Sequence, residues 1–197
     1  MNNIKLKVYG YFIIGLALVT WLSLIFITEG KLIITSKALL QIPNVISINV
    51  FIWFVFIKWL WKLKIFRGWL VPFPNLSGKW KGQVIPKNIN PTAGKQYDPI
   101  DVDVIIRQTF LSMHVRILSE EMESNSYATS FKLDAEANEK RLCYTYLSKP
   151  KANIRDRSPI HDGTAFLTIK GEKENKLEGE YWTSRASTGE IYLQRKK

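Results

Sequence analysis

Hydrophobic positions follow two different patterns along this chain, unbroken runs near the N-terminus and alternation with polar residues further on. Residues 9–27 are nineteen positions without a charge. As a helix rising 1.5 Å per residue they span about 28 Å, close to the roughly 30 Å hydrocarbon core of a bilayer. A second apolar run covers 42–61, with Pro43 in its first turn, where a missing N–H costs little. The pattern predicts two transmembrane helices, at about 9–27 and 42–61.

Two other interpretations of these runs fit less well. A signal peptide has a shorter apolar core followed by small residues at a cleavage site. The sequence after the first run is Thr28-Glu29-Gly30-Lys31, which is a poor cleavage site. Buried core helices would need a soluble domain large enough to cover both runs, and the rest of the chain is too small for that.

From residue 76 onward, short segments alternate in polarity and are separated by turn residues, which is typical of an antiparallel barrel or sandwich. We expect eight strands, the number that closes into a small barrel filled by side chains or holding one small ligand. They are predicted at about 77–86, 100–109, 112–119, 125–134, 140–147, 163–171, 176–184 and 189–195. The fold class is therefore a membrane-anchored all-β protein, a two-helix hairpin followed by a small antiparallel eight-stranded barrel.

The boundary between the two parts is predicted at Pro72 and Pro74, because proline lacks an N–H and disfavours helix in the preceding residue. Residues 1–72 then form the anchor, and 73–197 form the barrel domain. Two long loops, 87–99 and 149–162, are predicted at the barrel ends, where ligand contacts usually arise.

Alternation assigns one face of each strand to the barrel interior, and several of these faces carry polar tips. The inward polar side chains are Gln108, Tyr144, Tyr146, Tyr181 and Arg195. Leucine and valine would suffice to fill a small barrel, so polar tips favour a lumen that is wet or holds a ligand. The alternative is that each tyrosine hydroxyl binds a backbone carbonyl and the ring simply packs.

Trp80 lies on the first predicted strand, in the sequence Gly78-Lys79-Trp80. This Gly-x-Trp setting resembles the first strand of lipocalin-like barrels, where the tryptophan closes one end and stacks under an arginine near the last strand. Arg195 is placed for that stacking. We therefore expect Trp80 to be structural.

The charge of the chain is concentrated beside the apolar runs. The net charge is +11, of which residues 1–75 contribute +7, from eight Lys/Arg and one acid, and residues 76–197 the remaining +4. Basic residues flank both runs on their outer sides, at Lys5 and Lys7 and again within 58–70, so the positive-inside rule predicts cytoplasmic termini. Residues 58–70 are expected to continue the second helix as an amphipathic segment at the inner membrane surface. No basic helix or run stands out in the barrel domain, so DNA and RNA are not expected partners.

The sequence contains no recognisable catalytic or metal-binding pattern. Cys143 is the only cysteine, and His114 and His161 are the only histidines. His114 alternates to the outer face, whereas His161 opens a strand and is expected in a turn or capping role. Asp101 and Asp103 share the solvent face of their strand, which argues against a catalytic carboxylate pair. We therefore expect no enzyme, no metal and no resident cofactor.

Cationic and aromatic side chains are the remaining chemistry. Guanidinium groups bind phosphate bidentately, and aromatic rings provide flat surfaces for bases, a mixture suited to a nucleotide with two phosphates and two bases. The candidate ligand contacts within the barrel are Gln108, Tyr144, Tyr146, Tyr181 and Arg195, and the candidates at its rim are Arg107, Arg157, Trp182 and Arg185.

The order of sequence pieces resembles a known bacterial architecture. Two N-terminal spans precede PNLSGKWKGQV, VDVIIRQTF, LCYTYL, HDGTAFLTI, LEGEYWTSR and GEIYLQR. The whole chain resembles the two-transmembrane β-barrel effectors of CBASS, the cyclic-oligonucleotide-based antiphage signalling systems.

This resemblance implies a receptor in the bacterial inner membrane. A partner nucleotide cyclase would make a cyclic dinucleotide, and the barrel would bind it. Homo-oligomers would then form and disrupt the lipid bilayer, so that the infected cell dies. The ligand could sit inside one barrel or between barrels. Two alternatives are a membrane-tethered lipocalin-like carrier of an apolar molecule and a scaffold whose barrel binds a protein.

Overall fold

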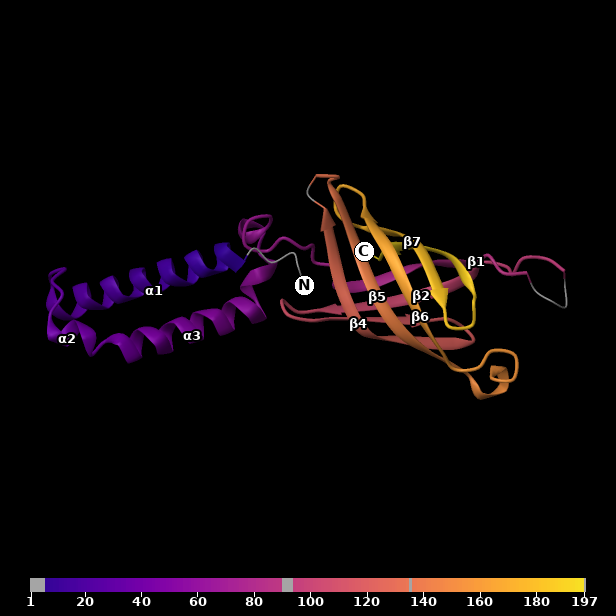
Figure 1. Cartoon of the computed structure of the whole chain (residues 1–197), viewed down its shortest axis with the longest axis horizontal. Coiled ribbons are helices and arrows are strands. Elements are labelled where there is room, and N and C mark those ends of the chain that lie inside the picture. The colour runs from indigo at the N-terminus through magenta and orange to yellow at the C-terminus, as the bar shows by residue number, and fades with distance from the viewer. Residues whose placement is uncertain (1–5, 90–93, 135, 197) are drawn as a thin grey trace. The chain divides into compact units, whose positions relative to one another are not determined.

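The computed structural model describes residues 6–89, 94–134 and 136–196. The chain divides into two compact units, the first ending at Pro72 and the second beginning at Phe73. Figure 1 shows the helices of the first unit and the strands of the second. Each unit has its own architecture and is described separately below.

The first unit is a hairpin of apolar helices. Its elements are α1 (Leu6–Glu29), α2 (Ser36–Leu39), α3 (Ile42–Lys58) and two 3₁₀ turns, η1 (Leu60–Lys62) and η2 (Lys64–Phe66). Helices α1 and α3 contact each other through aromatic rings, with Phe12 and Trp53 edge to face at 5.9 Å between centroids. The indole N–H of Trp21 on α1 donates to the carbonyl of Ala38 on α2 at 2.9 Å.

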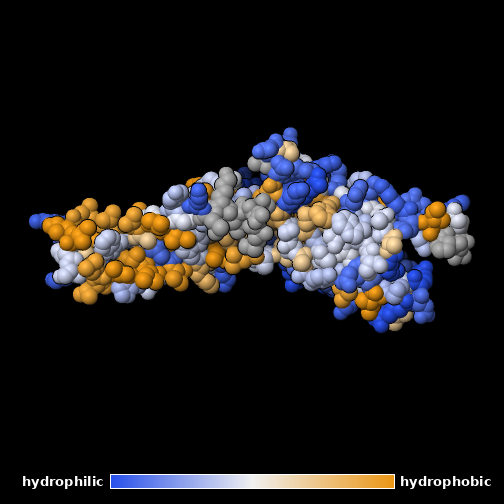
Figure 2. Space-filling view, in the orientation of Figure 1, coloured by the Kyte–Doolittle hydropathy of each residue, from blue (hydrophilic) through white to orange (hydrophobic). Residues whose placement is uncertain are grey.

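The outer surface of this hairpin is apolar (Figure 2). Leu18 and Val19 on α1 are 50% and 63% exposed, and Phe51 on α3 is 66% exposed. By length and composition, Lys7–Glu29 and Ser36–Lys58 are apolar enough to cross a membrane. The unit therefore contains two candidate membrane spans. Lys5, which enters the predicted topology, lies outside the described residues.

The segment after α3 differs from the prediction. Helix α3 ends at Lys58, short of residue 61, and the expected amphipathic helix over 58–70 is wrong. Leu63 has an extended backbone with ψ of 139°, and Gly68 has a left-handed φ of 86°. Both conformations break the i to i−4 hydrogen-bond series of an α-helix. The chain instead turns back through an N–H of Gly68 that donates to the Val71 carbonyl at 3.0 Å.

The second unit is a closed barrel of eight antiparallel strands, which confirms the predicted fold class. The strands are β1 (Gly78–Pro86), β2 (Ile100–Gln108), β3 (Met113–Leu118), β4 (Met122–Asp134), β5 (Glu139–Pro150), β6 (His161–Lys170), β7 (Lys176–Thr183) and β8 (Thr188–Arg195). Each strand pairs with the next along the chain, and β1 closes the circle by pairing with β8. The short helix η3 (Ala152–Ile154) lies in the β5–β6 loop.

Strands β4 and β5 extend further than the sequence pattern predicted. Their pairing continues to Met122 opposite Pro150, with a bulge between Ser126 and Ala128. This end of the two strands is rich in serine and other polar residues, so its alternation in polarity is weak. The added length carries β4 and β5 to the rim of the barrel.

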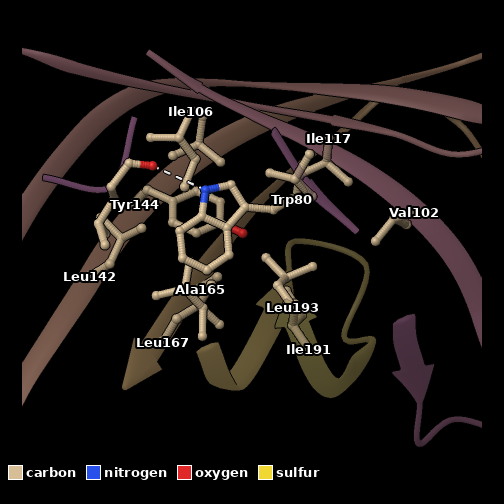
Figure 3. Packing of buried hydrophobic residues seen from close by; sticks show 14 of the residues in the cluster. Trp80, Val102, Ile106, Ile117, Leu142, Tyr144, Ala165, Leu167, Ile191 and Leu193 are labelled. Atoms are coloured by element: carbon tan, nitrogen blue, oxygen red, sulfur yellow. Dashed lines mark hydrogen bonds between the residues drawn. The ribbon is translucent and has the colours of Figure 1, made fainter. Parts of the chain in front are cut away.

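Trp80 lies near the start of β1 and closes that end of the barrel, as expected. Figure 3 shows its ring packed among the buried side chains of the core. Its side chain is 0% exposed, and its indole N–H donates to the carbonyl of Leu76 at 3.0 Å. The guanidinium carbon of Arg195 lies 4.9 Å from the ring centroid, which confirms the predicted cation–π contact. Around Trp80 the core is continuous and mostly aliphatic. It includes Leu142, Leu167 and other buried side chains of β1–β3 and β5–β8, and the partly buried Phe131 of β4 packs against it.

Candidate functional site

The two ends of the barrel differ, and the end away from Trp80 is open. The odd-numbered strands finish there and the even-numbered strands begin there, because the barrel is an antiparallel meander. A cavity of about 410 Å³ occupies this open mouth, within the range of small-ligand sites. The loops 87–99 and 151–160 leave the barrel at the same end (Figure 1). Residues 90–93 of the first loop lie outside the described chain.

One side of the cavity is apolar. Strands β1, β2, β3 and β8 contribute aliphatic side chains there, Val84, Ile100, Val102, Ile117 and Ile191. These residues continue the inward alternation that fills the core below. This half of the mouth therefore offers an apolar surface to the flat or apolar part of a ligand.

The opposite side of the cavity is polar and is formed by β4–β7 with their loops. It carries small hydroxyl side chains that are nine-tenths buried or more, Ser124, Ser148, Ser158 and Thr183. The hydroxyl oxygens of Ser124 and Ser148 are 2.6 Å apart across the β4–β5 pair. Buried polar groups gathered on one wall provide directed hydrogen bonds, which an aliphatic wall lacks.

Tyr146 and Tyr181 line the cavity because a glycine lies opposite each of them on the neighbouring strand. Tyr146 pairs with Gly163, and Tyr181 pairs with Gly189. A Cβ added to Gly163 would lie 2.4 Å from the ring of Tyr146, and one added to Gly189 would lie 2.6 Å from the ring of Tyr181. Each ring therefore occupies the space that a side chain on the neighbouring strand would take. Burial raises the pKa of both tyrosines, so both hydroxyls are protonated at neutral pH.

Two arginines lie at the rim of the cavity. Arg185 follows β7, and its Nη1 donates to the hydroxyl of Ser158 at 2.9 Å, which ties the two rim loops together. Arg157 lies in the β5–β6 loop and forms an ion pair with Glu121 in the β3–β4 turn. Both guanidinium groups are exposed enough to meet an anion from solvent. The rim is therefore suited to phosphate, which guanidinium binds through two parallel hydrogen bonds.

His161 begins β6, and its local contact with Pro159 agrees with the expected turn or capping role, but its side chain also lines the polar wall of the cavity. It is 6% exposed, and its Nδ1 lies 2.8 Å from the carbonyl oxygen of Pro159. Desolvation lowers its pKa below the ordinary value, and the charge of Arg185 lowers the pKa further. The hydrogen bond to Pro159 and the charge of Asp162 act in the opposite direction but do not outweigh desolvation. His161 is therefore neutral at pH 7.

The structure brings four of the nine predicted site residues together in the mouth, Tyr146, Tyr181, Arg157 and Arg185. Gln108 and Arg195 instead lie at the closed end and hold the chain that enters the barrel. Nε2 of Gln108 donates to the Pro74 carbonyl at 2.9 Å, and its Oε1 accepts from Leu76 N–H at 2.7 Å. Nη2 of Arg195 donates to the Asn75 carbonyl at 2.7 Å. The polar groups of both side chains are thus hydrogen-bonded to the backbone of 74–77.

Three further predicted residues lie outside the cavity. Tyr144 is buried beneath Tyr146, with 5.7 Å between ring centroids, and its hydroxyl has no hydrogen-bond partner among the described residues. Arg107 is exposed on the outer face of β2, one residue from its closed end. Trp182 is 46% exposed and stacks on Phe166 outside the barrel, with centroids 5.2 Å apart.

Sequence reasoning did not identify the buried serines and the histidine of the mouth as site residues. His161, Ser124 and Ser148 carry no recognisable motif, and single serines are common on strands. One signal was available: Gly163 and Gly189 interrupt strands that otherwise alternate, and a glycine within a strand often marks a place where another group approaches closely. Each of these glycines lies opposite a tyrosine of the site.

The lining of the mouth combines hydroxyl, aromatic and cationic side chains. Within residues 6–89, 94–134 and 136–196, no group of three or more His, Cys, Asp and Glu is arranged to hold a metal ion. His114 is exposed on β3, as predicted, and Asp101 and Asp103 are exposed on β2. A wall of tyrosines and aliphatic side chains under an arginine rim fits a ligand with flat rings and negative charge.

Comparison with known proteins agrees with this geometry. The family described as Cap15, cyclic dinucleotide receptor domain, matches residues 71–195, which is the whole barrel. CD-NTase-associated protein 15 of Staphylococcus schleiferi is 31% identical over 183 residues, covering 90% of this chain and 93% of that protein. An alignment covering 90% of the chain extends beyond the barrel into the helical unit. The chain therefore belongs to the Cap15 family of cyclic dinucleotide receptors, which are effectors of CBASS.

Proposed function

We propose that the open mouth of the barrel is the ligand site and that it holds a cyclic dinucleotide by its phosphates and its bases. The phosphates would face Arg185 and Arg157 at the rim, and a base would lie against Tyr146 and Tyr181. The observation that carries this proposal is the cavity of about 410 Å³ in which these four side chains meet. Buried tyrosines stay neutral and do not repel an anionic ligand.

We further propose that the ligand is made by a partner nucleotide cyclase and that the protein acts at the bacterial inner membrane. Residues 1–72 would be the anchor and 73–197 the cytosolic sensor. Lys and Arg are concentrated before the first apolar run and after the second. By the positive-inside rule, this supports both termini on the cytoplasmic side. The closed end of the barrel, where the chain arrives from the anchor, is opposite the ligand mouth.

Ligand binding would drive homo-oligomer formation, and the assembled helices would disrupt the bilayer and kill the infected cell. Residues 8–28 and 42–57 contain no Asp, Glu, Lys or Arg, so one hairpin has no charged ion pathway. A lesion must therefore come from several copies. The ligand can favour the assembled form only by as much as it binds that form more tightly.

The test uses the full chain reconstituted into vesicles of phosphatidylethanolamine and phosphatidylglycerol loaded with a fluorescent dye. A panel of cyclic dinucleotides containing guanine, adenine and uracil is added, and thermal stability, oligomeric state and dye release are measured. We expect at least one member to raise the unfolding temperature and to release dye.

Three results would contradict parts of the proposal. No stabilisation by any cyclic dinucleotide would reject the ligand class, and stabilisation without dye release would reject membrane disruption. Stabilisation by fatty acids but by no nucleotide would favour a tethered carrier, for which the apolar wall of the mouth is the supporting observation.

A further inference from the structure

The imidazole of His161 has one ring nitrogen without a hydrogen-bond partner in the described chain. His161 is more than nine-tenths buried and lines the cavity, yet its Nε2 makes no hydrogen bond to any described residue. Because His161 belongs to the lining of a cavity of ligand size, a polar group that enters the cavity can pair with this atom.

The proton on His161 can be assigned from its neighbour. The Pro159 carbonyl oxygen lies 2.8 Å from Nδ1, and a carbonyl oxygen can only accept a hydrogen bond. Nδ1 must therefore carry the proton that donates to Pro159. In a neutral imidazole, Nε2 then has a lone pair and no hydrogen, which makes it an acceptor.

We propose that His161 is a specificity-determining residue, whose Nε2 accepts a hydrogen bond from an N–H or O–H group of the bound nucleotide. The donor would be a ring or exocyclic N–H of a base, or a ribose 2′-hydroxyl. A phosphate oxygen carries no hydrogen at neutral pH and is not a partner for this atom. This inference rests on the proposed function, because it assigns a role within the same mouth.

The surroundings of His161 keep it in the accepting form. Arg185 is the nearby cation, and it disfavours a second positive charge on the ring. Asp162, next in the chain, acts in the opposite direction. Glu121 and Arg157 line the same cavity but are paired with each other. Tyr146 and Tyr181 remain protonated, so neither adds a charge.

The arginines and His161 can therefore recognise different groups of one ligand. Arg185 and Arg157 offer only donors and attract phosphate, whereas His161 offers an acceptor and selects a donor. A site that must hydrogen-bond a ligand group discriminates strongly against a ligand lacking it, because the buried protein atom is then left unpaired. His161 thus separates ligands that share the same phosphates but differ in their donors.

The experiment measures the affinity of the full chain in detergent micelles by isothermal titration. The probes are cyclic di-GMP, cyclic di-AMP, cyclic GMP–AMP, cyclic di-IMP (which lacks the exocyclic amine of guanine) and the 2′-deoxy form of the best binder. The variants are His161→Phe, which removes the acceptor, and His161→Gln, whose amide oxygen replaces it. His114→Gln, on the exposed outer face of β3, is the matched control.

We expect His161→Phe to lower affinity for the best ligand roughly tenfold or more, and His161→Gln to stay within about threefold of the natural protein. A ligand without the group that pairs with His161 should bind the natural protein more weakly by a similar factor. The same change in the ligand should alter the affinity of His161→Phe little. Circular dichroism confirms that each variant is folded before titration. Base-modified and 2′-deoxy probes identify which donor is read.

The results separate failure of this inference from failure of the proposed function. If the natural protein binds no cyclic dinucleotide, the proposed function is wrong and the role of His161 falls with it. If the natural protein binds a cyclic dinucleotide and His161→Phe binds every probe as tightly as the natural protein does, only the role of His161 is overturned. The same holds if no donor of the ligand shows an effect that depends on His161.

Discussion

The closed and open ends of the barrel are built by the same alternation of inward side chains, but their polar groups have different partners. At the closed end, Gln108 and Arg195 are hydrogen-bonded to the backbone of 74–77, and Arg195 also lies over the ring of Trp80. At the open end, His161 and the two tyrosines face a cavity. Polar groups that are satisfied internally hold a structure together, whereas those that face a cavity are available for a ligand.

This difference explains why an inward polar residue is a poor predictor of a binding site on its own. The amide of Gln108 and the imidazole of His161 are equally buried, at 8% and 6% exposed. They differ in whether the chain itself supplies the partner. The comparison of the two ends can be tested by changing one end and measuring both stability and binding.

The largest effect is expected at the closed end, from Trp80→Ala. Removing a fully buried indole and its cation–π contact with Arg195 should destabilise the barrel by about 3–5 kcal/mol. Urea-dependent hydrogen exchange of the barrel strands in the full chain measures this loss. Trp80→Phe should cost less, because a ring remains. A loss below 1 kcal/mol in Trp80→Ala would mean that this end is not the core of the fold.

The next effect separates the ends by binding. Arg185→Ala at the mouth should weaken cyclic dinucleotide binding about 10- to 100-fold with little change in stability, because a charge-assisted contact to phosphate is lost. Arg107→Ala at the closed end should leave affinity within about twofold. Titration calorimetry on both variants measures this. Equal losses in the two variants would break the assignment of the ligand to the open end.

Much of the fold could be predicted from the sequence because each prediction relied on local chemistry. All eight strands were expected, and turn residues such as Asn138 and Ala186 adopt the left-handed conformations that tight turns require. The helix predicted over 58–70 failed because propensity and amphipathicity do not register the turn that Gly68 makes toward Val71. That turn depends on packing within the helical unit.

The site was predictable only in part. Alternation identifies which side chains point inward, and it placed Tyr146 and Tyr181 correctly inside the barrel. It does not say whether another segment supplies a partner, as 74–77 does for Gln108. His161 was missed for the converse reason, since its role depends on the position of the Pro159 carbonyl in a loop without regular structure.

A smaller effect tests the boundary between the two ends, at Tyr144. Its hydroxyl is buried without a partner in the described chain, and an unsatisfied buried hydroxyl is unfavourable. Tyr144→Phe should therefore stabilise the barrel by about 1 kcal/mol and leave ligand affinity unchanged. Hydrogen exchange and titration on the same variant measure both quantities. A loss of affinity would instead mean that the ligand reaches Tyr144, as the sequence predicted, and that the site extends below the cavity.

The smallest effect is the pH dependence that His161 gives to the open end. Its pKa in the folded protein is below the ordinary value of 6.5, mainly through desolvation, so the unfolded chain binds a proton at a higher pH than the folded chain. The stability that neutral His161 contributes is therefore complete above about pH 6.5 and is lost as the pH falls through the folded pKa. His161→Gln cannot titrate and should lose less stability between pH 7.5 and 5.5, measured by urea unfolding at each pH. Because no residue of the closed end discussed above titrates in this range, Gln108→Leu should keep the pH slope of the natural protein while lowering stability at every pH. Parallel slopes in the natural protein and His161→Gln would show that the open end carries no such proton, and the difference between the two ends would then lie in hydrogen bonding alone.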